Sequence, residues 1–148
     1  MVHHGTIFYV DDNPKSRRLL TSVIRSCGFE VMSAGDPIEA LSRIKKSSFD
    51  LALLDYQMPH LTGSQLAQHI KRVKPDVPVV LLSGFSALPP FELIFADAHV
   101  GRGATLDELL DTMRSLIHSK YAFAKLRSAA RTRASGSTCA SLELGRAI

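Results

Sequence analysis

The sequence predicts an α/β fold in which helices cover both faces of a doubly wound parallel sheet. Short, uniformly apolar runs alternate with amphipathic helical segments, and 148 residues suffice for one such domain. Uniformly apolar strands are typical of parallel sheets, because crossover helices lie above and below them. Right-handed crossovers leave few topologies, of which a doubly wound sheet is the most economical. The predicted strands lie at residues 7–10, 29–33, 51–54, 77–82 and 98–100.

The segments between these strands have the end signals and apolar spacing of amphipathic helices. Asn13-Pro14 begins the first helix, and Gly28 ends it. Asp36 to Glu39 has the spacing of a capping box for the second helix, and residues 105–108 have the same spacing for the last. The apolar positions predicted to face the core are Leu19, Leu20, Val23, Ile24 and Cys27; Ile38, Leu41 and Ile44; Leu66, Ile70 and Val73; and Leu106, Leu109, Leu110, Met113, Leu116 and Ile117.

Two stretches depart from this pattern. Between residues 85 and 97, Pro89-Pro90 leaves room for only a short fourth helix, which we expect to be truncated or irregular. After residue 120, Tyr121, Phe123 and Leu126 prolong the last helix by at most two turns, and little apolar material follows Arg133. We therefore predict a domain over residues 1–120, followed by a helix extension and a basic, disordered tail over residues 121–148.

Charge is divided unevenly along the chain. Residues 1–118 hold 13 acidic and 12 basic residues, whereas residues 119–148 hold one acidic and six basic residues. The positive net charge of +4 therefore comes from the residues after 118. Only this basic tail could bind nucleic acid or an acidic partner by charge. No second amphipathic helix pair follows the last predicted helix, so we expect no DNA-binding domain.

The apolar runs and the cysteines point to one compartment. No apolar run approaches the length of a membrane span, and the N-terminus lacks the order of a signal peptide. Cys27 and Cys139 lie far apart in unlike contexts and are predicted to be free thiols. We expect a cytoplasmic protein without a membrane partner.

Acidic and polar side chains follow the predicted strands at their carboxyl ends, where ligands gather in an open parallel sheet. Asp11 and Asp12 end the first strand, Asp55 the third and Ser83 the fourth, and Arg102 follows the fifth. If the first and third strands are neighbours, three carboxylates converge. Each like-charge contact then costs about 4 kcal/mol at an effective dielectric constant of about 20. Such a cluster favours a functional role over a stabilising one.

A divalent cation would relieve this repulsion, and oxygen ligands with room for water suit Mg²⁺. Asp12 and Asp55 are the predicted direct ligands, Asp11 acts through water, and the backbone carbonyl of Gln57 completes the set. The chemistry indicated is in-line phosphoryl transfer to Asp55, with Ser83 and Arg102 contacting the phosphoryl oxygens. A purely structural alternative stays open, because Asp-Asp-Asn-Pro also suits the start of a helix and residues 55–59 an ordinary turn.

Three motifs resemble those of bacterial response-regulator receiver domains. They are Val10-Asp11-Asp12-Asn13, the run Asp50-Leu51-Ala52-Leu53-Leu54-Asp55-Tyr56-Gln57-Met58-Pro59 with Gly63, and Leu81-Leu82-Ser83-Gly84. The resemblance covers about residues 5–118. It implies a CheY-like sheet in the order 2-1-3-4-5, Mg²⁺-dependent phosphorylation of Asp55, and a histidine kinase or phosphotransfer protein as donor.

Two positions depart from the pattern of that family. Arg102 stands where the family usually has a lysine, and a planar guanidinium does not grip a phosphoryl group as an ammonium does. His99 stands where many receivers have a Tyr or Phe that rotates toward the switch residue, here Ser83. The output surface is the least typical part of the chain, so the resemblance names neither the downstream protein nor the oligomeric state, and a homodimer stays open.

The resemblance favours a stand-alone receiver that signals by protein contacts and is no enzyme beyond slow self-phosphorylation and self-dephosphorylation. The main alternative is a pseudo-receiver that binds partners without control by phosphate. A phosphohydrolase with an aspartate nucleophile is disfavoured, because Gln57 stands where its general acid belongs. A flavodoxin-like cofactor binder is disfavoured too, because Asp11 and Asp12 would repel a flavin phosphate.

Overall fold

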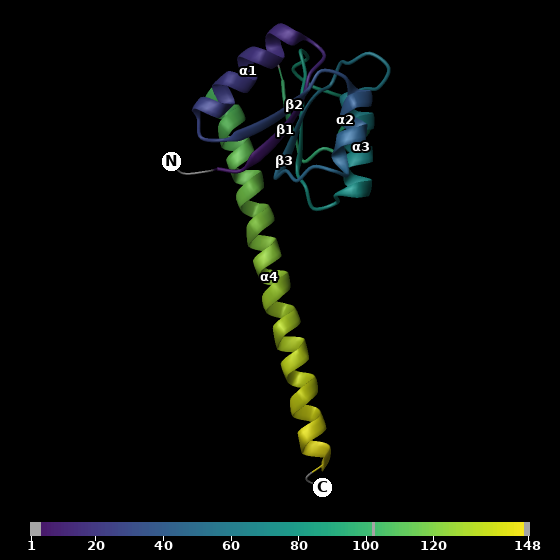
Figure 1. Cartoon of the computed structure of the whole chain (residues 1–148), viewed down its shortest axis with the longest axis vertical. Helices are drawn as coiled ribbons and strands as arrows, with labels where there is room; N and C mark the ends of the chain where they lie inside the picture. The colour runs from purple at the N-terminus through teal and green to yellow at the C-terminus, as the bar shows by residue number, and fades with distance from the viewer. Residues whose placement is uncertain (1–3, 102, 147–148) are drawn as a thin grey trace. The chain divides into compact units, whose positions relative to one another are not determined.

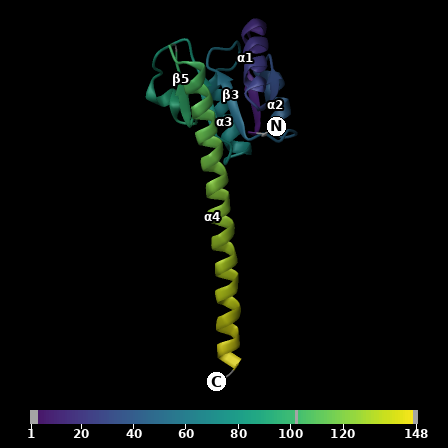
Figure 2. The ribbon, with the colours of Figure 1, turned by 90° about the vertical axis from the view of Figure 1, so that its left-hand side faces the viewer.

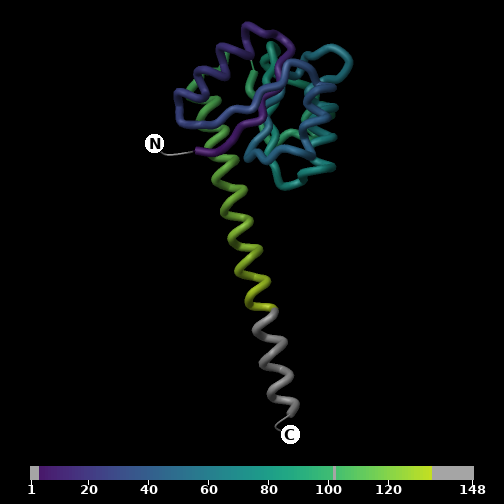
Figure 3. The backbone as a smooth tube through the Cα atoms, in the orientation of Figure 1, coloured from purple at the N-terminus to yellow at the C-terminus, as the bar shows by residue number. Residues whose placement is uncertain are grey.

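The computed structural model describes residues 4–101 and 103–146, with side chains described up to residue 134. Five parallel strands form one sheet in the order β2-β1-β3-β4-β5, as predicted (Figure 1). Figure 3 follows the backbone through the alternation of strands and helices. The elements are β1 (Thr6–Val10), α1 (Pro14–Ser26), β2 (Glu30–Ala34), α2 (Pro37–Ile44), β3 (Leu51–Asp55), α3 (Gly63–Val73), β4 (Val79–Leu82), the 3₁₀ turn η1 (Pro90–Leu93), β5 (Ala98–Val100) and α4 (Leu106–Arg146).

Helices cover both faces of the sheet (Figure 1). Successive side chains of a strand point to opposite faces, so Ile7 and Tyr9 pack with α1 and the part of α4 up to Ile117, whereas Phe8 and Val10 pack with α2 and α3. β1 and β3 are central and buried on both faces, which explains their uniformly apolar sequences. β2 and β5 form the two edges, and β5 lies on the side of the domain away from α1 (Figure 2).

The two predicted capping boxes differ in outcome. At the start of α4, the Thr105 backbone N–H donates to Glu108 Oε2 (2.6 Å), and the Glu108 N–H donates to Thr105 Oγ1 (3.2 Å). At the start of α2, Asp36 Oδ1 accepts from the Ile38 N–H (2.6 Å), but Glu39 pairs with an arginine one turn later. Asp36 therefore caps the helix, but neither of the two hydrogen bonds between Asp36 and Glu39 that would make a capping box is found among the described residues. The caps begin both helices at the predicted residues.

Thirteen of the 17 predicted core positions are buried or half-buried, and the prediction is wrong for the other four, which are exposed. Leu19, Ile38, Val73 and Leu106 are 69%, 56%, 39% and 42% exposed. Each lies at the margin of its apolar stripe, and only a limited arc of a surface helix contacts the sheet. Leu19 and its neighbour Leu20 point about 100° apart, so the helix buries one at the expense of the other.

The connection between β4 and β5 is the least regular part of the domain. Its helix is reduced to the single turn η1, as Pro89-Pro90 predicts. Leu88 is buried in the core, whereas Phe91 and Ile94 are each 68% exposed. Without an amphipathic helix to turn them inward, several large apolar side chains of this connection stay at the surface.

The described residues fall into two compact units, one ending at Ile117 and one beginning at His118. In the second unit α4 continues to Arg146, further than the two extra turns predicted. That prediction weighed apolar content alone, whereas the alanines and arginines of this stretch are strong helix formers without burial. The division at residue 120 stays a prediction. Within the described part of the chain, no helix combines the length and apolarity that a bilayer crossing requires.

Candidate functional site

The carboxyl ends of β1 and β3 bring three acidic side chains together. β1 and β3 pair in parallel with Val10 opposite Leu54, so Asp11 and Asp55 both follow this pair at the same edge of the sheet. One carboxylate oxygen from each of Asp11, Asp12 and Asp55 lies within 4.8 Å of the others. The predicted convergence of charge is therefore present in the structure.

Burial and repulsion act together on Asp55. The pKa of the Asp55 carboxyl is raised to about 6, mostly by burial and then by the negative charges of Asp11 and Asp12. A hydrogen bond with the Gln57 backbone acts in the opposite direction. The ionised form of Asp55 is thus held in a place that disfavours it, and a bound cation would favour it.

Asp11 is the fixed member of the cluster. Its side chain is only 6% exposed and accepts from the Tyr9 hydroxyl (Oδ2, 2.6 Å) and from the Asn13 backbone N–H (Oδ1, 2.9 Å). Arg17 Nη1 also donates to the Asp11 backbone carbonyl (2.8 Å). Burial and the neighbouring carboxylate raise the pKa of Tyr9, so its phenol stays protonated and donates.

Tyr9 is a site residue that the sequence analysis missed. The uniformly apolar pattern of its strand predicts a buried side chain, and Tyr9 is 1% exposed. The signal was its spacing, because residues two apart in a strand point to the same face and a buried tyrosine hydroxyl needs a partner. Tyr9 and Asp11 meet this condition.

The donor set fits a hard divalent cation. All three side chains are carboxylates, with neither imidazole nor thiolate among them, which suits Mg²⁺ better than a softer metal. Each carboxylate oxygen of Asp11 already accepts a hydrogen bond, and its role through water stays a prediction. The direct roles of Asp12 and Asp55, and that of the Gln57 carbonyl, stay predictions.

The loop after Asp55 closes tightly on this edge. The Gly63 N–H donates to the Tyr56 carbonyl (2.9 Å), and a Cβ at Gly63 would lie 2.4 Å from the Asp55 carbonyl oxygen. Met58, 8% exposed, anchors the loop in the core. Only glycine lets α3 begin so close to the strand that carries Asp55, which explains Gly63 in the motif.

A surface hollow of about 330 Å³ joins Asp55 to Ser83. β3 and β4 pair with Asp55 opposite Leu82, so Ser83 follows at the same edge. Ser83 Oγ accepts from the Phe85 N–H (2.9 Å), which leaves the hydroxyl proton free to donate to an incoming oxygen. Thr105, which the sequence predicts only as a helix cap, lines the hollow as well.

The structure does not place the two remaining predicted residues at this hollow, for different reasons. Arg102 lies outside the described residues. His99 is half-buried on β5 opposite Leu81 and does not line the hollow, and its Nε2 is buried without a hydrogen-bond partner in the part of the chain that the structure describes. Its rotation toward Ser83 stays a prediction.

The sheet order and the acidic edge, which is the cluster of Asp11, Asp12 and Asp55 at the carboxyl ends of β1 and β3, define the class: a doubly wound α/β domain with three carboxylates at the ends of its central strands. Residues 7–98 match the family model of the response regulator receiver domain. The chain belongs to this family.

Its curated relatives include much longer sensor kinases. The chain is 31% identical over 110 residues to the sensor histidine kinase RcsC of Salmonella typhi, which is 72% of this chain and 12% of RcsC. It is 29% identical over 119 residues to the autoinducer 1 sensor kinase/phosphatase LuxN of Vibrio harveyi, which is 79% of this chain and 14% of LuxN. The chain thus spans about an eighth of their length, and the activities of those whole proteins are not transferred to it.

Solved structures agree on the fold. The response regulator TrrA of Thermotoga maritima in complex with Mg²⁺-BeF is 31% identical with a TM-score of 0.71, and the match covers 75% of this chain and 97% of TrrA. TrrA in complex with the histidine kinase ThkA matches with the same identity and coverage and a TM-score of 0.69. A receiver domain of Clostridium thermocellum, 24% identical, matches over 80% of this chain and 98% of its own with a TM-score of 0.74, which shows the fold alone.

Proposed function

We propose that this chain is a stand-alone receiver that accepts a phosphoryl group on Asp55 from a histidine kinase or phosphotransfer protein, with Mg²⁺, and signals by binding another protein. The proposal places it in the cytoplasm. One observation carries it: three carboxylates at the ends of adjacent strands lie with oxygens within 4.8 Å of one another. The repulsion makes such an arrangement unfavourable without a bound cation, and a cation held there would also attract the oxygens of a phosphoryl group.

In the proposed reaction an oxygen of the ionised Asp55 carboxylate forms the bond to phosphorus, while the bond to the donor breaks and the donor keeps its electron pair. With a pKa of about 6, Asp55 is mostly ionised at neutral pH. Asp12 and Asp55, with Asp11 acting through water, would hold Mg²⁺, which would neutralise charge on the phosphoryl oxygens. Ser83 donates its hydroxyl proton to one of those oxygens.

The relatives support the donor and the ion. TrrA, 31% identical, has been solved with Mg²⁺-BeF and in complex with a histidine kinase. Since this chain has Asp11, Asp12 and Asp55 at one edge of the same fold, the same kinds of ligand suit it.

Incubation with Mg²⁺ and acetyl phosphate, followed by intact-mass measurement, tests the proposal. We expect one phosphoryl adduct in the native chain, none after Asp55→Asn, and loss of the adduct when EDTA removes the metal. Asp107→Asn, an exposed acid on α4, is the matched control and should keep the adduct. A native chain that gains no adduct would instead be a pseudo-receiver, whose partner binding does not depend on phosphate.

A further inference from the structure

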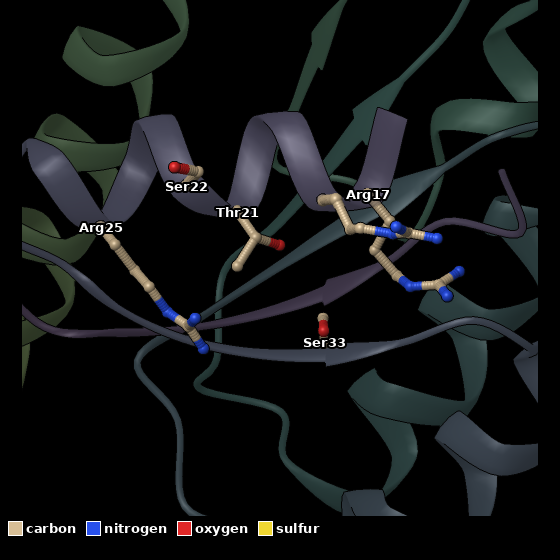
Figure 4. A pocket seen from close by; sticks show the side chains of 6 residues that line it. Arg17, Thr21, Ser22, Arg25 and Ser33 are labelled. Carbon is tan, nitrogen blue, oxygen red and sulfur yellow. The ribbon is translucent and has the colours of Figure 1, made fainter. Parts of the chain in front are cut away.

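A second hollow, of about 330 Å³, lies between α1 and β2 and shares no lining residue with the hollow beside Asp55. Figure 4 shows Thr21 and Arg25 pointing from α1 toward the strand that carries Ser33. Its lining contains no acidic and no aromatic residue. It consists of Arg17, Arg18, Thr21, Ser22, Arg25 and Ser33.

Backbone carbonyls hold two of the three arginine side chains at this hollow. Arg17 Nη1 donates to the Asp11 carbonyl (2.8 Å), and Arg25 Nη2 donates to the Val31 carbonyl (2.9 Å). Carbonyl oxygens hold a guanidinium in place but carry no net charge, and each guanidinium has further N–H groups to donate. None of the ion pairs found among the described residues includes an arginine of this hollow.

The backbone makes room for one of these guanidinium groups. A Cβ at Gly35 would lie 2.6 Å from Arg17 Nη1 and 2.8 Å from its Cζ. Any other residue at this position would displace the Arg17 side chain or be displaced by it. The absence of a side chain at Gly35 therefore keeps the cation beside the hollow.

The hydroxyl groups supply a second, independent observation. Thr21 is only 8% exposed, and its Oγ1 is buried without a hydrogen-bond partner within the described chain. A buried unpaired hydroxyl costs about 1–3 kcal/mol. Ser33 lies two residues from Val31 on the face of β2 that α1 covers, where Val31 joins the core. Polar groups thus replace apolar packing at this point of the helix–sheet interface.

Three guanidinium groups with hydroxyl donors match a multiply charged oxyanion, because guanidinium forks bind phosphate oxygens two at a time. The lining offers no ring on which a nucleobase could stack. We infer that the hollow between α1 and β2 is a binding site for a multiply charged phosphate, either free polyphosphate or the phosphate group of a small ester. This site is separate from the proposed phosphorylation of Asp55.

Calorimetric titration of the full chain with pyrophosphate, without Mg²⁺ and at constant ionic strength, tests this inference. We expect saturable binding of one ligand per chain. Arg18→Gln should weaken it by about tenfold or more, since it removes one charge-assisted contact. Arg72→Gln, an exposed arginine on α3, makes the same change of charge elsewhere and should weaken it by less than about twofold.

Thr21→Val is the second variant, because it keeps the shape of the side chain and removes only the hydroxyl. It should weaken binding severalfold while circular dichroism shows an unchanged fold. Asp55→Asn should bind pyrophosphate as the native chain does, because the acidic edge is not the site. A parallel titration with glucose 6-phosphate distinguishes an ester from free polyphosphate, and binding of either one supports the inference.

Three results would overturn the inference. They are binding of neither phosphate, equal weakening by Arg18→Gln and Arg72→Gln, and loss of binding in Asp55→Asn. The second would show a general effect of charge, and the third would place the anion at the acidic edge. None of these results depends on the phosphoacceptor role of Asp55, which the acetyl phosphate experiment tests by itself.

Discussion

The acidic edge and the connection between β4 and β5 begin at the same end of one sheet but are built in opposite ways. At the acidic edge, buried groups and close backbone contacts hold like charges together, and Asp11 is 6% exposed with three hydrogen-bonded neighbours. In the β4–β5 connection a single 3₁₀ turn leaves Phe91 and Ile94 at the surface. The first region is rigid and strained by charge, whereas the second is loosely packed and should tolerate change.

The largest expected contrast comes from adding one methyl group to each region. In Gly63→Ala the new Cβ would lie 2.4 Å from the Asp55 carbonyl oxygen, in a strand that is buried and cannot move. In Gly101→Ala it would lie 2.5 Å from the Phe85 carbonyl oxygen, which belongs to the looser connection. We expect Gly63→Ala to lower the free energy of unfolding by about 3 kcal/mol and Gly101→Ala by about 1 kcal/mol.

Urea unfolding followed by circular dichroism measures both values. The acetyl phosphate reaction gives a second readout, since displacement of Asp55 should slow it in Gly63→Ala far more than in Gly101→Ala. If the two variants lose the same free energy of unfolding, the acidic edge is no more rigid than the connection between β4 and β5.

The next variant should raise the free energy of unfolding. Asp55→Asn removes one of three like charges, so it should raise the free energy of unfolding in metal-free buffer at pH 7 by about 1–2 kcal/mol after screening by water. Mg²⁺ should stabilise the native chain and leave Asp55→Asn nearly unchanged. Thermal unfolding with and without MgCl₂ measures both, and a destabilised Asp55→Asn would show that the cluster is not repulsive.

The stability gap between the native chain and Asp55→Asn should depend on pH. Burial and the neighbouring acids raise the pKa of Asp55 from 3.8 in the unfolded chain to about 6. The folded state therefore binds the proton more tightly, and the native chain loses stability relative to Asp55→Asn as pH rises between these two values. The gap should be absent below about pH 3 and complete above about pH 7. A gap that stays constant over this range would contradict the raised pKa.

The acidic edge was predictable because its residues are tied to strand ends. Asp11, Asp12 and Asp55 each follow an apolar run, and parallel pairing brings such ends together. The bond between Tyr9 and Asp11 was not foreseen, because an apolar strand pattern hides a polar tip. The hollow of Arg17, Thr21 and Ser33 could not be predicted either, since it depends on how α1 lies over β2.

A carboxylate in the looser region should behave in the opposite way to Asp55. Asp97 Oδ2 accepts from the buried Val79 N–H (2.8 Å) and from Lys71 Nζ (2.6 Å). Asp97→Ala should cost about 1 kcal/mol, mostly for the unpaired N–H, because exposed ion pairs contribute little. Asp111→Ala, which removes only an exposed pair with Arg114 (3.7 Å), is the control and should cost less than about 0.5 kcal/mol. If both variants lose the same free energy of unfolding in urea, the hydrogen bond from the Val79 N–H to Asp97 contributes nothing to stability.

The smallest change in stability is expected at the surface of the loosely packed connection between β4 and β5. Phe91→Ser removes a ring that is 68% exposed, so the free energy of unfolding should change by less than about 0.5 kcal/mol. Leu88→Ala lies three residues earlier, but its side chain is 8% exposed and packs in the core, so it should cost clearly more. Urea unfolding of both variants shows whether this connection is held to the core by Leu88 alone or is packed along its whole length. If Phe91→Ser is as costly as Leu88→Ala, the surface of this connection carries stability, and its exposed aromatic residues are part of the fold.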